Sequence, residues 1–132
     1  MRYATALGRS PADTYRQIDI AGRTTEANGH ALVGLLYEEL GRALRAAGFA
    51  AANQQYSIRA EKVSRSMAIL FALDAGLDFD SGGDIAHTLS RLYAGARQTV
   101  ADASLGHDPR PFNNIADSMD EIAVAWRTVG RA

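Results

Sequence analysis

Apolar residues recur at steps of three and four along most of this chain, and that spacing predicts amphipathic helices. Two of the stripes occupy arcs of roughly 80 to 100° on a helical wheel, wide enough to bury one face of a helix. The first comprises Ile85, Leu89, Leu92, Ala96, Val100 and Ala103, and the second comprises Phe112, Ile115, Met119, Ile122, Trp126 and Val129. The sequence therefore predicts two long helices in its second half that face one core.

Two further stripes precede these in the chain. The first comprises Leu32, Leu35, Leu36, Leu40, Ala43, Leu44 and Ala47. It is followed by Gly48, a residue type that tolerates the left-handed conformation at a helix end. The second comprises Tyr56, Ala60, Val63, Met67, Ile69, Leu70 and Leu73, within a helix predicted from about Asn53 to Ala75. Asn28, Asn53 and Asp84 are the predicted capping or first-turn residues.

Breaks in the pattern define how the helices connect. The three prolines, Pro11, Pro109 and Pro111, stand where a helix can begin and not inside a periodic run. Between two stripes, Gly76 and the pair Gly82-Gly83 permit a reversal of the chain. No stretch alternates apolar and polar residues long enough for a sheet strand. The prediction is one all-α domain, an antiparallel up-down four-helix bundle over residues 28–130 with a short N-terminal capping segment or helix over 1–27.

The N-terminal arm, residues 1–27, lies outside this predicted bundle. Ser10-Pro11-Ala12-Asp13 has the pattern of a helix start. Ile18 and Ile20 also fit an extended segment, so both conformations stay open. With Tyr15, these two residues make the arm apolar, and it is expected to lie on the surface of the bundle or to be displaced from it.

Charge and composition argue against several classes of protein. The 14 basic and 15 acidic residues give a net charge of -1, which lacks the positive footprint of a nucleic-acid-binding protein. The absence of cysteine leaves no disulfide framework and fits a reducing compartment. Met1 to Ala12 lack the apolar stretch of a secretory signal, and no run approaches the ~18 apolar residues of a membrane span. We therefore expect a cytoplasmic protein without membrane insertion.

Catalytic and metal-binding patterns are weak. A dimetal carboxylate bundle needs Glu-x-x-His motifs on two helices, whereas the nearest pattern here is the single run Asp84-Ile85-Ala86-His87. His30, His87 and His107 are expected to be surface residues without a partner. Neither a Gly-x-Ser-x-Gly elbow nor a phosphate-binding glycine loop is present. We expect no catalytic residue, no metal and no cofactor.

The apolar arcs leave more surface than a bundle seam requires. The helix predicted from Asn53 to Ala75 is apolar over about 160°, with Met67 at one edge of that arc. Val33 and Tyr37 lie to one side of the leucine stripe, and Tyr93 stands at the edge of its own. Each residue alone fits a bundle rim. Together they suggest an elongated groove of the kind that receives helical or extended peptides.

Several segments of this sequence resemble the FliS family of flagellar secretion chaperones. They are Tyr15-Arg16-Gln17-Ile18-Asp19-Ile20, Leu32-Val33-Gly34-Leu35-Leu36-Tyr37-Glu38, Gly76-Leu77-Asp78 with Gly82-Gly83-Asp84-Ile85-Ala86, Leu89, Leu92-Tyr93, and Ile122-Ala123-Val124-Ala125-Trp126. No single segment is diagnostic, but their order and separation over about Asp13 to Val129 are specific. Two departures are Asn28-Gly29, where many relatives have Ser-Pro, and Leu36-Tyr37-Glu38-Glu39, where Leu-Tyr-Asp-Gly is common.

The resemblance implies a cytoplasmic chaperone, not an enzyme, for the flagellar type III export apparatus. Its implied partner is the disordered C-terminal segment of flagellin, which it would protect from premature polymerisation, with other flagellar regulators or export-gate components as further candidates. It also implies that the N-terminal arm covers part of the binding surface when the client is absent. The candidate partner-binding residues are Tyr15, Ile18, Ile20, Val33, Tyr37, Met67 and Tyr93. The free protein is expected to be a monomer or a weak homodimer.

Two alternatives from other classes stay open at this point. A helical dimerisation or regulatory module with a different peptide partner would use the same leftover apolar surface. A bundle metalloenzyme would be revealed by metal analysis of the purified protein.

Overall fold

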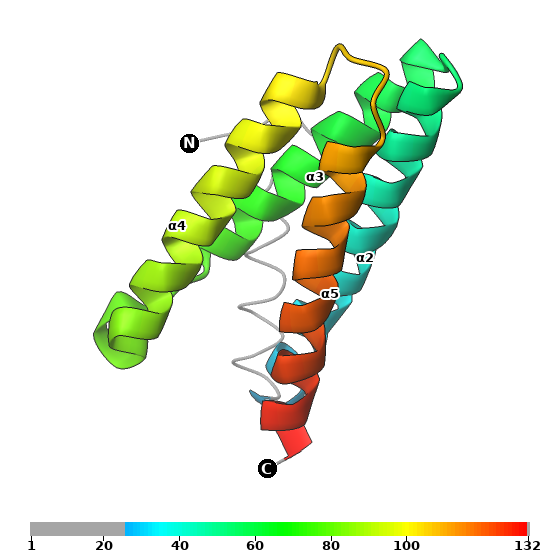
Figure 1. Cartoon of the computed structure of the whole chain (residues 1–132). Coiled ribbons are helices and arrows are strands. Elements are labelled where there is room, and N and C mark those ends of the chain that lie inside the picture. The colour runs from blue at the N-terminus through cyan, green and yellow to red at the C-terminus, as the bar shows by residue number, and fades with distance from the viewer. Residues whose placement is uncertain (1–25, 132) are drawn as a thin grey trace.

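The computed structural model describes residues 26–131, and the side chains of residues 29–129. Over this range the chain forms four helices: α2 (Glu26–Ala52), α3 (Tyr56–Ala75), α4 (Phe79–Ala103) and α5 (Arg110–Arg131). Figure 1 shows successive helices running in opposite directions, which confirms the predicted all-α antiparallel bundle. The N-terminal arm lies outside the described residues, except that its last two residues already belong to α2. None of the described helices is long and apolar enough to cross a membrane.

Helix α2 is the central element of the bundle, because it packs against α3 on one side and against α5 on the other. Helix α4 packs against α3 and, over a shorter stretch, against α5. Figure 1 shows α4 diverging from α5 toward the end of the bundle where α2 begins and α5 ends. The fully buried large side chains are Leu40, Leu44, Ile69, Leu70, Tyr93, Val100, Phe112 and Met119. All four helices therefore contribute to one core, and one end of the bundle is more open than the other.

Three glycines of α2 stand at intervals of seven residues on the side that faces α5. Seven residues are close to two helical turns, so Gly34, Gly41 and Gly48 form one row. A Cβ atom placed on Gly41 would lie 3.0 Å from the Asp120 carboxylate, and one on Gly48 would lie 3.2 Å from the Pro109 carbonyl oxygen. The row lets the backbones of α2 and α5 approach closely. The periodicity of the apolar residues alone does not reveal this row of glycines.

The prediction that Gly48 ends the first long helix is wrong, because α2 continues to Ala52. Gly48 is buried, and a Cβ there would also lie 3.4 Å from the Cβ of Phe112. Glycine suits this position because it is small, and not because it tolerates a left-handed backbone conformation. A glycine inside a helix costs roughly 0.5–1 kcal/mol relative to alanine, and close packing against α5 offsets that cost.

The predicted capping role of Asn53 is also wrong. Its side-chain amide donates a hydrogen bond to the carbonyl of Phe49, 2.8 Å away, so Asn53 closes the end of α2. Gln54 then adopts a positive φ of 57° in the turn. Helix α3 begins at Tyr56 after Gln55, whose side chain makes no capping hydrogen bond. The turn between α2 and α3 is therefore held from the helix that precedes it.

Helix α4 begins five residues earlier than predicted, at Phe79 and not at Asp84. Its N-cap is Asp78, whose carboxylate accepts hydrogen bonds from the backbone N–H groups of Ser81 and Asp80 at 3.0 and 3.1 Å. These hydrogen bonds, from Ser81 first, lower the pKa of the Asp78 carboxyl. The added turn precedes a kink at Gly83, and sequence periodicity alone detects only the helix after the kink.

We expect Gly83→Ala to destabilise the protein by about 1–3 kcal/mol, although nothing lies within 4 Å of a Cβ placed there. The cause is the backbone, because Gly83 has φ 52° and ψ -128°, a combination that residues with a side chain rarely adopt. The matched control is Gly95→Ala, at an equally open helical position, where alanine should stabilise by up to about 1 kcal/mol. Urea denaturation of both variants measures the difference, and equal effects would rule out strain at the kink.

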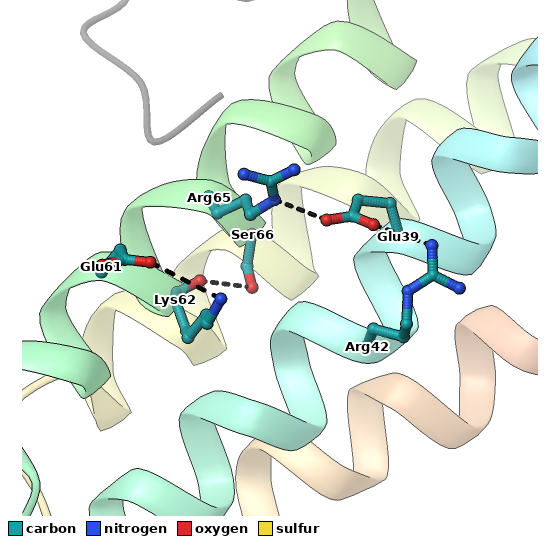
Figure 2. A network of polar contacts seen from close by, with 6 residues as sticks. All are labelled: Glu39, Arg42, Glu61, Lys62, Arg65 and Ser66. Atoms are coloured by element: carbon teal, nitrogen blue, oxygen red, sulfur yellow. Dashed lines mark hydrogen bonds and ion pairs between the residues drawn. The ribbon is translucent and has the colours of Figure 1, made fainter. Parts of the chain in front are cut away.

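Ion pairs connect α2 to both of its neighbours. Figure 2 shows Glu39 of α2 accepting a hydrogen bond from Arg65 Nε of α3, at 2.6 Å. Across the other seam, Arg45 contacts Asp117 at 2.9 Å and Asp120 at 2.6 Å on α5. Pairs with this degree of exposure contribute about 0–1 kcal/mol each, so they set register more than they supply stability.

Some residues of the predicted core stripes lie on the surface instead: Leu35, Tyr56, Ile85, Leu92 and Val129. Leu35 is displaced to the outer face of α2, because its three-residue step from Leu32 leads away from the buried arc. Ile85 lies in the first half of α4, Leu92 lies at its middle, and Val129 lies near the end of α5. Figure 1 shows the beginning of α4 diverging from the end of α5. The periodicity of apolar residues predicted which face of each helix is apolar. It did not predict how far along the helix a neighbouring helix covers that face.

Candidate functional site

A pocket of about 110 Å³ lies at the open end of the bundle. It is lined by Val33, Leu36 and Tyr37 of α2, Ala72 and Leu73 of α3, Gly76 and Leu77 of the following turn, Leu89 and Tyr93 of α4, and Trp126 of α5. The pocket is therefore built from the beginning of α2 and α4 and the end of α3 and α5, which Figure 1 places at one end of the molecule. Its lining is predominantly apolar.

Apolar surface continues from the pocket along two helices. Leu89 lines the pocket, and Ile85 and Leu92 stand four residues before it and three residues after it, so the three side chains are neighbours on α4. Ile85 is 72% exposed, and Leu92 is also exposed. On α5, the exposed Val129 follows Trp126 by three residues. Exposed apolar side chains of α4 and α5 therefore stand next to residues that line the pocket.

Two tyrosines form the inner wall of the pocket. Tyr37 is 3% exposed and Tyr93 is 1% exposed, and their hydroxyl groups are hydrogen-bonded to each other. Burial raises the pKa of both phenols, and the proximity of Tyr37 raises that of Tyr93 further. Both groups therefore remain neutral at physiological pH. Sequence periodicity placed these residues at the rims of their helices, but the structure buries them, with their two hydroxyls hydrogen-bonded to each other inside the bundle.

The wall contributed by α4 is held to α3 by a polar contact next to Tyr93. Asp74 of α3 accepts a hydrogen bond from the Ser90 hydroxyl at 2.8 Å and pairs with Arg97 at 3.2 Å. The Arg97 guanidinium also lies over the Phe71 ring, 4.5 Å from its centroid. These contacts attach the middle of α4 to α3.

Trp126 is held in the pocket wall by a reciprocal contact with His30. The indole Nε1 donates to the His30 carbonyl at 2.7 Å, and His30 Nε2 lies 2.6 Å from the Trp126 carbonyl. Because a carbonyl oxygen only accepts, His30 Nε2 carries the hydrogen of this bond. The two rings stack with centroids 4.0 Å apart and an interplanar angle of 5°. The beginning of α2 and the end of α5 are therefore clasped together, and the prediction of a solvated His30 without a partner is wrong.

The other two histidines are exposed, as predicted, but each contacts an aromatic ring. His87 packs on Phe79 with ring centroids 4.7 Å apart, and His107 contacts Tyr56 at 5.9 Å. Within residues 26–131, histidine, aspartate and glutamate side chains form no group of three that could hold a metal ion.

The structure brings together three of the predicted partner-binding residues, since Val33, Tyr37 and Tyr93 all line the pocket. Met67 is half-buried and packs against the core, but it does not line the pocket. The remaining predicted residues, Tyr15, Ile18 and Ile20, lie outside the described part of the chain.

The other pocket residues were not among the predicted partner-binding residues: Leu36, Ala72, Leu73, Gly76, Leu77, Leu89 and Trp126. Most of them were present in the quoted motifs or in the core stripes, where they were read as packing or turn residues. The only signal that could have found them is their position, because each lies at the same end of an up-down bundle once the helix directions alternate.

Fold and site together define a class: a small antiparallel helical bundle whose open end presents an apolar pocket suited to a peptide segment. Comparison with known proteins then identifies the family, because the family model described as "Flagellar protein FliS" matches residues 11–132. The chain belongs to the FliS family. It is a chaperone of the flagellar export system and not an enzyme.

Individual relatives agree with this assignment. The flagellar secretion chaperone FliS of Campylobacter jejuni is 33% identical over 98 residues, covering 74% of this chain and 77% of the relative. The protein of the same name from Salmonella typhimurium is 28% identical over 116 residues, covering 87% and 86% of the two chains. That of Vibrio cholerae is 27% identical over 120 residues, covering 89% and 87%. The similarity thus extends over most of each protein.

Proposed function

We propose that this protein acts in the cytoplasm, where it binds the disordered C-terminal segment of flagellin. Binding prevents premature polymerisation and keeps flagellin competent for export by the flagellar type III secretion system. The observation that carries the proposal is the apolar pocket at the open end of the bundle, together with the exposed Ile85, Leu92 and Val129 beside it. Membership of a secretion chaperone family supports the same reading.

The physical properties of such a surface suit a client that must later be released. Isolated exposed apolar residues are ordinary, but a continuous apolar surface next to a preformed pocket is typical of a binding site. A disordered segment that folds onto it gives up roughly 2–5 kcal/mol of the interaction energy in ordering itself. The resulting complex is specific because the buried surface is large, and it remains releasable because the net affinity is moderate.

Calorimetric titration of the purified protein with a synthetic peptide of the host flagellin's C-terminal segment tests this proposal. We expect a 1:1 complex and a negative heat-capacity change, since apolar surface is buried. A peptide of the same composition in scrambled order is the control and should not bind. Absence of a 1:1 complex with the native peptide would reject the flagellin assignment, and concentration-dependent self-association through the apolar surface would then favour the dimerisation module.

We further propose that the N-terminal arm covers the apolar surface when the client is absent, through Tyr15, Ile18 and Ile20. We expect Tyr15→Ala to tighten binding of the flagellin peptide, because a weakened arm competes less with the client. Deletion of residues 1–20 should tighten it further and leave the helical thermal transition in place. Loss of that transition on deletion would show instead that the arm belongs to the core.

A further inference from the structure

The hydroxyl groups of Tyr37 and Tyr93 carry two hydrogens, but only one of them is donated in a hydrogen bond within the described residues. Tyr37 and Tyr93 each carry one O–H hydrogen, and each hydroxyl can also accept. Their mutual hydrogen bond consumes one of the two hydrogens. Within the described residues, that bond is the only one that either hydroxyl makes. One O–H donor at the inner wall of the pocket is therefore left without a protein acceptor.

This spare donor belongs to a pair of buried side chains that line the pocket. Both rings are almost completely shielded from solvent, at 3% and 1% exposure, and both line the pocket. A donor that is buried without a partner costs about 1–3 kcal/mol, so a ligand atom that accepts its hydrogen recovers part of that cost. The hydrogen stays in place at physiological pH, because burial raises the pKa of both phenols.

The size of the pocket limits the apolar group that can enter. Its volume is about 110 Å³. This lies between the ≈ 30 Å³ occupied by a water molecule and the ≈ 150 Å³ of a dry cavity that accepts benzene. A branched aliphatic side chain of the size of leucine or isoleucine fits this volume.

The surroundings also favour a neutral acceptor over a charged one. The lining is predominantly apolar, and an ionised carboxylate loses much of its hydration when it enters such a site. A main-chain carbonyl oxygen meets these conditions, because it accepts a hydrogen bond and carries no net charge.

We propose that the pocket receives one branched aliphatic side chain of the client segment, and that the Tyr37–Tyr93 hydroxyl pair donates its spare hydrogen to a main-chain carbonyl oxygen of that segment. This inference rests on the proposed function and specifies which part of the client is read at the pocket. Specificity then comes from one anchoring side chain and one main-chain hydrogen bond, while the exposed apolar surface along α4 and α5 adds contact area.

Phenylalanine substitutions test the hydrogen bond without changing the shape of the rings. The double variant Tyr37→Phe/Tyr93→Phe removes the donor and should weaken binding of the flagellin C-terminal peptide by about three- to ten-fold. Of the two single variants, Tyr37→Phe and Tyr93→Phe, the one that keeps the donating hydroxyl should bind the peptide with the affinity of the wild type. If the pair only stabilises the fold, the double variant will change the unfolding transition but bind the peptide as the wild type does, and that result would overturn the hydrogen-bond assignment.

Filling the pocket tests the anchoring side chain. Ala72 lines the pocket and is 2% exposed, so Ala72→Leu places three further carbon atoms at the pocket wall. We expect at least a ten-fold loss of peptide affinity, whereas the matched control Ala94→Leu, at an exposed position of α4, should bind as the wild type.

An alanine scan of the peptide against the unchanged protein gives the same information if Ala72→Leu does not fold. One leucine or isoleucine should dominate, and a loss spread evenly over the scan would contradict a single anchor.

These outcomes separate the inference from the function on which it rests. If the wild-type protein fails to bind the flagellin peptide, the proposed function is wrong and the inference falls with it. If the wild type binds, but the double phenylalanine variant and the filled pocket bind equally well, the proposed function stands and only the inference is rejected.

Discussion

Replacing Phe112 with alanine is expected to lower the free energy of unfolding by about 3–5 kcal/mol, the range for deleting a fully buried aromatic ring. Phe112 is 0% exposed and belongs to the central core cluster. It stands at the beginning of α5, opposite Gly48 of α2, so its removal leaves a cavity in the seam between α2 and α5. The surrounding helices cannot close this cavity easily, because both backbones are already in contact there.

The same substitution at Phe49 is the matched control. Phe49 is 64% exposed on the outer face of α2, only one residue after Gly48, so alanine there should cost less than about 1 kcal/mol. Guanidinium denaturation followed by circular dichroism measures both variants, and an unchanged slope with denaturant shows that the same surface is exposed on unfolding. Similar losses for the two variants would contradict the placement of Phe112 in the core.

Replacing Trp126 with alanine is expected to destabilise the protein by about 2–3 kcal/mol and to weaken client binding. Deleting a fully buried aromatic ring costs about 3–5 kcal/mol, whereas a substitution on the surface costs under about 1 kcal/mol. The structure places Trp126 between these limits, half-buried, stacked on His30 and lining the pocket. Alanine removes the stacking, the Nε1 hydrogen bond to His30 and one wall of the binding site.

A phenylalanine at this position separates these contributions. Trp126→Phe keeps an aromatic ring against His30 but removes the Nε1 donor, so it should cost only about 1 kcal/mol, the typical net value of one hydrogen bond. Thermal denaturation and peptide titration of both variants give the two measurements. Wild-type stability of Trp126→Ala would mean that the clasp between α2 and α5 does not contribute to the fold.

The positions of the pocket residues explain why the sequence could predict part of the site only. Val33, Tyr37 and Tyr93 were identified because they depart from narrow apolar stripes, and the structure brings them together in one pocket. Ala72 and Gly76 carry no such signal, because small residues read equally well as packing or turn positions. Their role depends on the neighbouring helices, whose separation is not encoded in the local pattern of any one segment.

Met67 was predicted from the same periodicity, but the structure does not place it in the pocket. Its position at the edge of a wide apolar arc suggested leftover surface, but the structure packs it against the core. A wide arc arises when a helix has two or more neighbours as well as when it has a free face. Periodicity does not distinguish these cases, so it identifies Met67 as an apolar position, and a role of Met67 in partner binding stays a prediction.

The sequence by itself determined that this protein is an all-α bundle, approximately where its helices lie, and to which family it belongs. These properties are local or linear: apolar periodicity, the placement of proline and glycine, and the order of short motifs. Only the tertiary structure decided that Gly34, Gly41 and Gly48 form a packing row, that His30 clasps Trp126, and that Tyr37 and Tyr93 meet inside the bundle. Each of these depends on the distance between helices far apart in the chain, and that distance follows from how all the side chains pack together.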